Sequence, residues 1–271
     1  MTALKFSRKH LGIPYALFMA MFVVFRLLLI IYYAFTDPTT GRVSVVNFID
    51  FFTSNANLTA LFMSFALALL TTAICLLIAY PTAYILARTD INRNGVMLLL
   101  FILPMWINFV LRTAAMKELL YSLGMFNSNK LSFVNTLIGM VYDYLPFTVL
   151  PIYTVLEKLD KNVLEASSDL GASGIQTLFK VTIPLSMPGV VSAITMVLLP
   201  TMTSYVVSDT LGNGNITIIG KLIENQFSVM YNWNAGSAIA MILLVFIFGT
   251  MLITGKFAEK DESTTRGGGL W

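Results

Sequence analysis

Six long apolar runs constrain this chain more than any other feature of its sequence. They cover residues 11–35, 58–87, 96–115, 133–156, 183–207 and 235–255. A run of about 20 apolar residues is long enough to cross the hydrocarbon core of a bilayer as a helix, and a helix satisfies its own backbone hydrogen bonds there. The chain is 57% hydrophobic and only 11% charged, which excludes an ordinary soluble domain. We predict an all-α integral membrane protein with six transmembrane helices, in a single domain over 1–257 with a polar tail over 258–271.

The lysine and arginine residues between the runs indicate how the chain crosses the membrane. If the N-terminus is inside, the inner segments carry eleven of them and the outer segments five, while Arg26 lies within the first run. Positively charged loops favour the cytoplasmic side of a membrane. We therefore expect a multi-pass membrane protein, with both termini and the 158–182 segment in the cytoplasm and the 208–233 segment outside.

The polar segment between the fourth and fifth runs is longer than a turn between two membrane helices requires. Residues 161–170 contain helix formers with apolar side chains on one face, and Gly171 is a typical stop at the C-terminal end of a helix. A second short turn is expected over 176–181. A segment of helix, bend and helix on the cytoplasmic side predicts a docking contact with another protein.

Catalytic and metal-binding patterns are missing from the sequence. It contains one histidine and one cysteine, which cannot build a metal cluster or a nucleophile with its base. Asp143 and Asp209 are expected at different depths, so they do not form an aspartic protease pair. Gly220 and Lys221 lack the other residues of a phosphate-binding loop. We expect no enzyme activity, no cofactor or metal, and no binding of nucleotide or nucleic acid by this chain.

Charged residues inside apolar runs are costly unless they are paired or line a pathway. Arg26 in the first run and Asp143 in the fourth both lie about 15 Å from the outer ends of their runs, at 1.5 Å per residue. Two interpretations remain open for Asp143. It forms an ion pair with Arg26, or it is a carboxylate that meets a cationic substrate.

Further polar and aromatic residues occur together on runs that contain prolines. Trp106 and Asn108 follow Pro104, and Tyr205 is followed by Ser208 and Asp209. An aromatic face combined with a carboxylate suits an organic cation. Together with Asp143 these five residues are our candidates for a substrate pathway. Core packing is the alternative for Trp106, and a capping or interface role is the alternative for Asp209.

The 158–182 segment resembles the EAA loop of ABC-transporter permeases. Glu165, Ala166 and Gly171 match its spacing, and the loop ends on Val181-Thr182-Ile183-Pro184, although Ser167 replaces its second alanine. Several other stretches are similar to the spermidine/putrescine branch of that family, namely 104–108 with Arg112, 157–161, 183–189, 205–209, and 219–220 with 226–227. Arg26 departs from the family, in which an uncharged residue is expected.

The resemblance implies the architecture of a type I ABC importer, in which this chain is half of a pathway for polyamines that works by alternating access. It implies a place in the bacterial inner membrane and three kinds of partner beside membrane lipid: a second homologous permease, two ATPase subunits that hold ATP and Mg, and an extracytoplasmic binding protein. It also implies a coupling role for Glu165, Ala166, Asp169 and Gly171. The alternatives are a permease for another solute, such as an inorganic oxyanion, or a channel or scaffold without an energy source.

Overall fold

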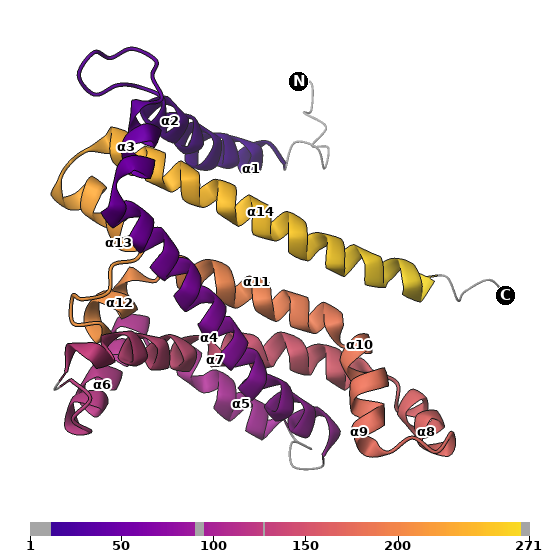
Figure 1. Cartoon of the computed structure of the whole chain (residues 1–271). Helices are drawn as coiled ribbons and strands as arrows, with labels where there is room; N and C mark the ends of the chain where they lie inside the picture. The colour runs from indigo at the N-terminus through magenta and orange to yellow at the C-terminus, as the bar shows by residue number, and fades with distance from the viewer. Residues whose placement is uncertain (1–11, 90–94, 127, 267–271) are drawn as a thin grey trace, which may run out of the picture. The chain divides into compact units, whose positions relative to one another are not determined.

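The computed structural model describes residues 12–89, 95–126 and 128–266, and these residues are helical apart from turns and one isolated bridge between Thr36 and Val43 (Figure 1). They divide into two compact units. The first contains residues 1–58 and 222–245, and the second contains 59–221 and 246–271, as far as these residues are described. Residues 1–11, which include the expected cytoplasmic N-terminus, and residues 267–271 of the expected tail lie outside the described part.

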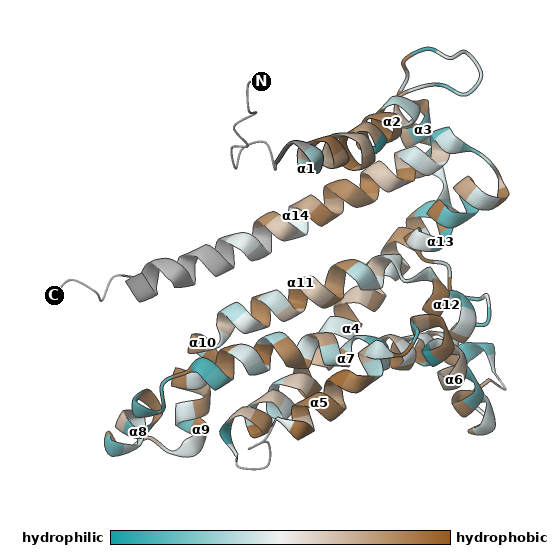
Figure 2. Cartoon of the chain, turned by 180° about the vertical axis from the view of Figure 1, so that it is seen from behind, coloured by the Kyte–Doolittle hydropathy of each residue, from teal (hydrophilic) through white to brown (hydrophobic). Residues whose placement is uncertain are grey.

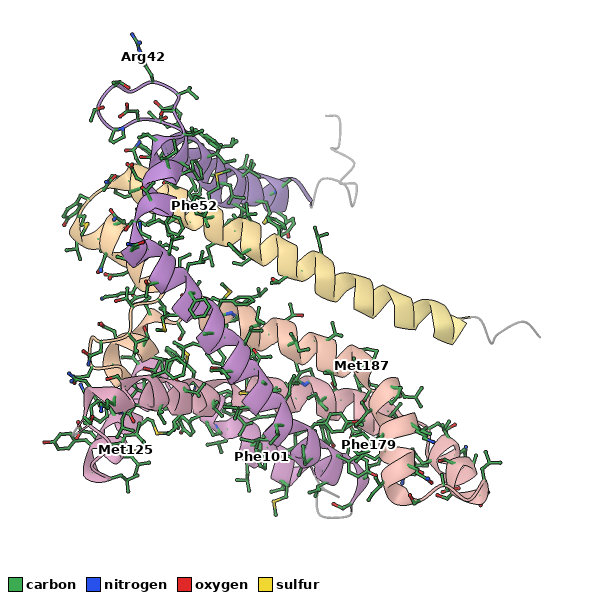
Figure 3. All side chains as sticks on the ribbon, in the orientation of Figure 1. Arg42, Phe52, Phe101, Met125, Phe179 and Met187 are labelled. Carbon is green, nitrogen blue, oxygen red and sulfur yellow. The ribbon has the colours of Figure 1, made fainter. Side chains whose placement is uncertain are left out.

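The first unit is organised by two amide side chains that cap the end of a membrane helix. Its helices are α1 (Gly12–Met19), α2 (Phe25–Ala34), α3 (Val46–Thr53) and the first part of α14 (Trp233–Arg266). Asn47 donates from Nδ2 to the carbonyls of Ala34 and Thr36, each at 3.0 Å. Asn234 donates to the carbonyl of Thr36 at 2.7 Å. Carbonyls at a helix end lack partners inside the helix, so these bonds fix where the chain leaves α2. Arg42 projects from the tip of the loop that follows (Figure 3).

The second unit holds most of the long helices. Its helices include α4 (Asn55–Arg88), α5 (Val96–Ile102), α6 (Phe109–Ser122), α7 (Ser132–Lys158), α8 (Lys161–Asp169), α9 (Gly174–Thr177), α10 (Ile183–Leu185), α11 (Met187–Thr203) and α12 (Tyr205–Leu211), and α13 (Ile219–Glu224) begins in this unit. α7 and α11 lie side by side (Figure 1). A Cβ atom on Gly189 of α11 would lie 2.9 Å from the carbonyl oxygen of Pro151 on α7. Glycine therefore allows the two backbones to touch.

Five of the six predicted membrane helices are confirmed within the described residues. The helices that are long and apolar enough to span are Pro14–Ala34, Asn55–Arg88, Asn129–Lys158, Gly174–Thr203 and Trp233–Leu252. Apolar residues run along α2, α5 and α14, whereas α8 is more polar (Figure 2). Two boundaries differ from the prediction. The fifth helix ends at Thr203 and not at residue 207, and α14 continues to Arg266, so the first part of the expected tail is helical.

The third predicted span, over 96–115, is sharply bent within the membrane run. Two segments, Val96–Trp106 and Phe109–Ser122, meet at a bend of 96°. Ile107 has extended backbone angles, and the Asn108 side chain accepts hydrogen bonds from the backbone N–H groups of Val110 and Leu111 at 2.9 and 3.3 Å. An asparagine that caps a helix in this way starts a new helix. The pair counts as a sixth span only if its two segments are taken together.

Candidate functional site

A pocket of about 420 Å³ lies in the second unit, where α6 and α7 meet the break between α11 and α12. Phe109, Tyr144, Phe147 and Tyr205 contribute aromatic rings to its wall. Its polar lining includes Arg112, Asp143 and Ser204. The pocket therefore combines aromatic faces with one pair of opposite charges inside a largely apolar protein.

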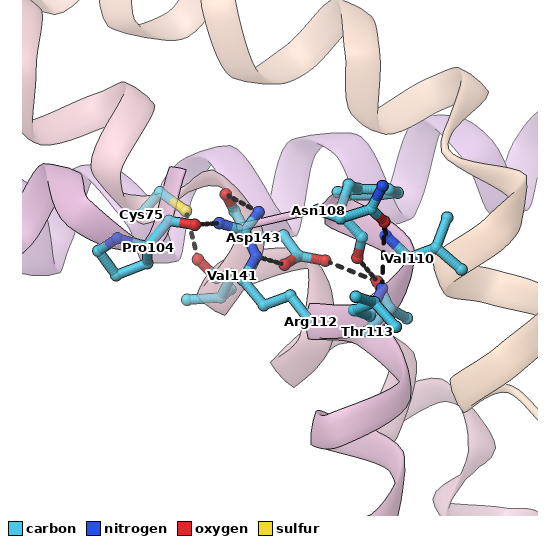
Figure 4. A network of polar contacts seen from close by, with 10 residues as sticks. Cys75, Pro104, Asn108, Val110, Arg112, Thr113, Val141 and Asp143 are labelled. Atoms are coloured by element: carbon cyan, nitrogen blue, oxygen red, sulfur yellow. Dashed lines mark hydrogen bonds and ion pairs between the residues drawn. The ribbon is translucent and has the colours of Figure 1, made fainter. Parts of the chain in front are cut away.

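Arg112 and Asp143 form a buried ion pair at this pocket (Figure 4). Arg112 Nε donates to Asp143 Oδ1 at 2.6 Å, and both side chains are almost inaccessible, with exposed fractions of 5% and 1%. The guanidinium also donates to the carbonyl of Pro104 at 2.9 Å and to the carbonyl of Asp143 at 3.3 Å. Thr113 donates to the second carboxylate oxygen of Asp143 at 3.3 Å. Because each charge has several partners, burial is tolerated here.

A pair of Asp143 with Arg26 was one of the two interpretations left open by the sequence, and in the structure the partner of Asp143 is Arg112. The bend after Trp106 is the physical reason, because it turns α6 so that Arg112 reaches both the end of the preceding segment and α7. A straight third helix would have carried Arg112 toward the outer membrane surface. Arg26 instead lies in the first unit, with its guanidinium 5.5 Å from the ring centre of Phe22, and it lines a separate pocket with Tyr33 and Trp233.

A second helix break forms another part of the pocket wall. α11 ends at Thr203, and Ser204 adopts angles outside the helical region before α12 begins. Gly220 of α13 packs on this break, since a Cβ atom there would lie 2.5 Å from the carbonyl oxygen of Thr203. Irregular backbone at membrane depth is tolerated where it is packed against protein or lines a cavity. The break at Ile107–Asn108 and the break at Ser204 thus meet at the pocket.

The structure brings together only some of the residues predicted for the pathway. Asp143 and Tyr205 line the pocket. Trp106 is 80% exposed, and Asn108 caps α6. Ser208 is buried and donates to the carbonyl of Tyr205 at 3.0 Å. Asn108 and Ser208 therefore bind backbone groups beside the pocket and do not line it.

Asp209 lies on the exposed side of α12 and contacts a lysine from α13. Its Oδ2 atom is 3.4 Å from Nζ of Lys221, and the two side chains are 50% and 25% exposed. The same ammonium is 5.7 Å from the ring centre of Tyr205. The neighbouring helix α13 therefore supplies a cation for this carboxylate.

Sequence reasoning missed the cation of the buried pair and most of the aromatic wall. Arg112 lies near the end of the third apolar run, and Tyr144 and Phe147 lie within the fourth, so nothing in the pattern of apolar residues sets them apart. The available signal was the Pro104 and Asn108 pair, because a proline and a capping residue so close together interrupt a helix. Within the described residues, no group of three or more His, Cys, Asp or Glu side chains is placed to hold a metal.

The segment after α7 forms an exposed groove. α8 begins at the Asp160 cap, which accepts from the backbone N–H of Asn162 at 3.0 Å, and ends before Gly171, whose φ of +82° favours glycine. The hydroxyl groups of Ser167 and Thr177 are 2.9 Å apart and join α8 to α9. The groove has a volume of about 420 Å³ and is lined by Val163, Ala166, Ser167, Leu170, Ala172, Gln176, Lys180 and Val181.

The predicted coupling residues lie on or beside this groove. Ala166 is in its wall, and Leu170 beside it is 88% exposed. Glu165 and Asp169 are exposed on α8, outside the lining of the groove. Arg88 at the end of α4 donates to the carbonyl of Leu159 at 3.2 Å, which ties the start of the segment to the membrane helices. An exposed apolar groove on an otherwise polar segment is typical of a protein contact.

Residues 79–255 match the family described as "Binding-protein-dependent transport system inner membrane component". This match covers the pocket, both helix breaks and the exposed groove. The chain belongs to this family. The resemblance drawn from the 165–171 segment is therefore confirmed, and the chain is a membrane component of a transport system that works with a binding protein.

Relatives within the family carry the name that the 104–108 and 205–209 stretches suggested. The spermidine/putrescine transport system permease protein PotB of Haemophilus influenzae is 37% identical over 204 residues, which cover 68% of this chain and 71% of that protein. PotB of Escherichia coli K12 is 37% identical over 203 residues, which cover 70% of this chain and 74% of that protein.

Solved structures confirm the all-α permease fold of a type I ABC importer. A chain in the crystal structure of a bacterial alginate ABC transporter in complex with an alginate pentasaccharide-bound periplasmic protein has a TM-score of 0.76 and 11% sequence identity, with 93% of both chains covered. A chain in a second structure, of an ABC transporter involved in the import of alginate, has a TM-score of 0.68 and 13% identity. At these identities the likeness concerns the fold alone.

Proposed function

We propose that this chain is the permease subunit of an ATP-driven importer for polyamines such as spermidine and putrescine. The observation that carries the proposal is the 37% identity to PotB proteins over more than two thirds of their length. The pocket supports it, because four aromatic rings line a space of about 420 Å³ in which the one buried arginine is already neutralised by Asp143. Alkylammonium groups bind well to aromatic faces that lie close to a negative charge.

The mechanism is alternating access, in which two conformations expose the pocket to opposite sides of the membrane. In the conformation described here, Arg112 neutralises Asp143. The aromatic rings of the pocket then supply attraction for a cation without holding it too strongly for release. Asp209 supplies a partly exposed carboxylate beside Tyr205, at the edge of the same wall.

The groove formed by α8, α9 and the turn after α9 is our candidate for the contact with the ATPase. Glu165 and Asp169 offer charges beside the groove, Ala166 lies in its wall, and Gly171 ends the helix. A helical stretch of 30 residues, Gly174–Thr203, starts at this groove and ends at the pocket. Movement of the ATPase can therefore reach the pocket through the consecutive helices α9, α10 and α11.

The complete transporter in this proposal contains a second homologous permease, two ATPase subunits that bind ATP and Mg, and an extracytoplasmic binding protein. The groove and both termini lie in the cytoplasm, as the charge distribution of the sequence predicts. Membrane lipid covers the exposed apolar faces of the spans. The binding protein delivers the polyamine from the other side.

The site gives less support to an inorganic oxyanion as the cargo. An anion pathway needs cationic side chains whose charge is available at membrane depth. At the pocket, the charge of Arg112 is opposed by Asp143 at 2.6 Å. A neutralised arginine among aromatic rings favours an organic cation over sulfate or molybdate.

Uptake by the complete transporter tests this proposal. We expect cells that lack other polyamine carriers to take up labelled putrescine and spermidine when this chain is expressed with its ATPase, sister permease and binding protein. Deletion of this chain or loss of ATP hydrolysis by the ATPase should abolish uptake, and excess sulfate should leave it unchanged. Uptake of sulfate in place of polyamines by the same cells would assign the chain to another cargo.

A further inference from the structure

Lys221 occupies a place with two features that recognise an alkylammonium ion. Its Nζ atom lies 3.4 Å from Oδ2 of Asp209 and 5.7 Å from the ring centre of Tyr205. Tyr205 and Asp209 are four residues apart on α12, so their side chains leave the same face of the helix. The carboxylate and the ring thus approach one ammonium group from the same element.

The backbone of α13 holds Lys221 in this place. The N–H of Ile219 donates to the Ser64 hydroxyl at 2.7 Å, and Ile219 is completely buried. Gly220 packs against the carbonyl of Thr203 so closely that a Cβ atom would not fit. Two consecutive anchored residues therefore precede Lys221, and its side chain starts from a fixed point.

The lysine side chain has the same chemistry as the end of the proposed substrate. The lysine side chain is four methylene groups that end in a primary ammonium. Protonated putrescine is four methylene groups with a primary ammonium at each end, so either end resembles the lysine side chain. A site that fits Lys221 also fits this end of a polyamine. Tyr205 also lines the pocket, so the two groups lie at its edge.

We propose that Tyr205 and Asp209 form a subsite for a primary alkylammonium, and that Lys221 occupies this subsite as an internal competitor which the substrate must displace. The proposal rests on the proposed function, because it names how the same permease admits its cargo. A polyamine displaces the lysine because its second ammonium gains a further contact within the pocket.

The experiment measures putrescine uptake by the complete transporter with Lys221→Gln, which removes the competing charge. We expect the KM for putrescine to fall about fivefold, equal to about 1 kcal/mol at 1.4 kcal/mol per tenfold, while the maximal rate stays within about twofold of wild type. Lys221→Met keeps the apolar stem beside Tyr205 and should give the same result. Asp209→Asn should raise KM, and Lys221→Gln should no longer lower it in that background.

Lys130→Gln is the matched control, because it removes one positive charge from an exposed position close by. Asn129, next to it, accepts from Asn215 at 3.4 Å, so both lysines belong to the same end of the second unit. We expect no change in KM for this variant. An equal fall in KM for Lys130→Gln, or an unchanged KM for both Lys221 variants, would mean that Asp209 and Lys221 form an ordinary surface ion pair. Either result would contradict the proposal that Lys221 competes with the substrate. Absence of polyamine uptake by the wild type would instead contradict the proposed function.

Discussion

Burying Arg112 beside Asp143 takes two charges out of water, and this cost is offset only because each charge has several partners. Nε binds one carboxylate oxygen, Thr113 binds the other, and the remaining guanidinium donors reach the backbone of Pro104 and Asp143. The network also crosses the bend in the third span. One residue pair therefore fixes the position of α6 against α7 and sets the charge of the pocket.

Removing one partner of this pair should destabilise the protein more than removing both. Asp143→Leu leaves a buried guanidinium without its carboxylate, and we expect a loss of about 3–5 kcal/mol in unfolding free energy. The double variant Arg112→Leu with Asp143→Leu should recover most of that loss. Thermal unfolding of the purified complex in detergent measures both effects.

The exposed pair of Asp209 with Lys221 gives a control for this prediction. Because both of its side chains are partly in water, Asp209→Asn should change the unfolding free energy by at most about 1 kcal/mol. If the double variant at Arg112 and Asp143 were less stable than either single variant, the pair would not be the source of the cost.

At the scale of elements, the sequence predicts which segments are helical better than it predicts where they break. Apolar run length located the five continuous spans, because crossing a bilayer requires a minimum length. It did not predict the bend between Val96–Trp106 and Phe109–Ser122. The length of an apolar run does not tell in which direction the helix continues. At Asn108 the direction of α6 depends on the capping hydrogen bonds and on the contact of Arg112 with α7. For the same reason the sequence did not indicate that Arg112 is the partner of Asp143.

The segment at 158–182 was predicted as helix, bend and helix, and the structure shows α8, the Gly171 turn and α9. Gly171→Pro should disturb the end of α8, because proline cannot adopt a φ of +82° and would remove the N–H that binds the Ser168 carbonyl at 2.9 Å. We expect the variant to enter the membrane normally and to lose most of its substrate-stimulated ATP hydrolysis and uptake.

Gly174→Pro is the matched control for the change at Gly171. Gly174 is the first residue of α9, where proline is well tolerated, and Ser173 before it has the extended conformation that a following proline favours. We expect nearly normal ATP hydrolysis and uptake. Equal loss in both variants would mean that any proline in the segment is harmful and that Gly171 has no particular role.

At the scale of the molecule, the proposal places the groove in the cytoplasm and the connection before α7 outside. Cys75, the single cysteine of the sequence, is buried, so an introduced cysteine is the main target for a thiol reagent. Asn162→Cys on α8 and Lys130→Cys before α7 are both exposed positions. We expect a membrane-impermeant maleimide to label the first only from the cytoplasmic side and the second only from outside. Labelling of both from one side would contradict the six-span topology.

The close contact of Gly189 with Pro151 has a mechanical consequence. Gly189 lies three residues after Ser186, whose backbone angles separate α10 from α11 within the Gly174–Thr203 stretch. Because the backbones touch beside this break, α7 can serve as a pivot at the start of α11. A push on the groove end would then turn α9 and α10 about this point, and α11 would carry the movement on to the pocket.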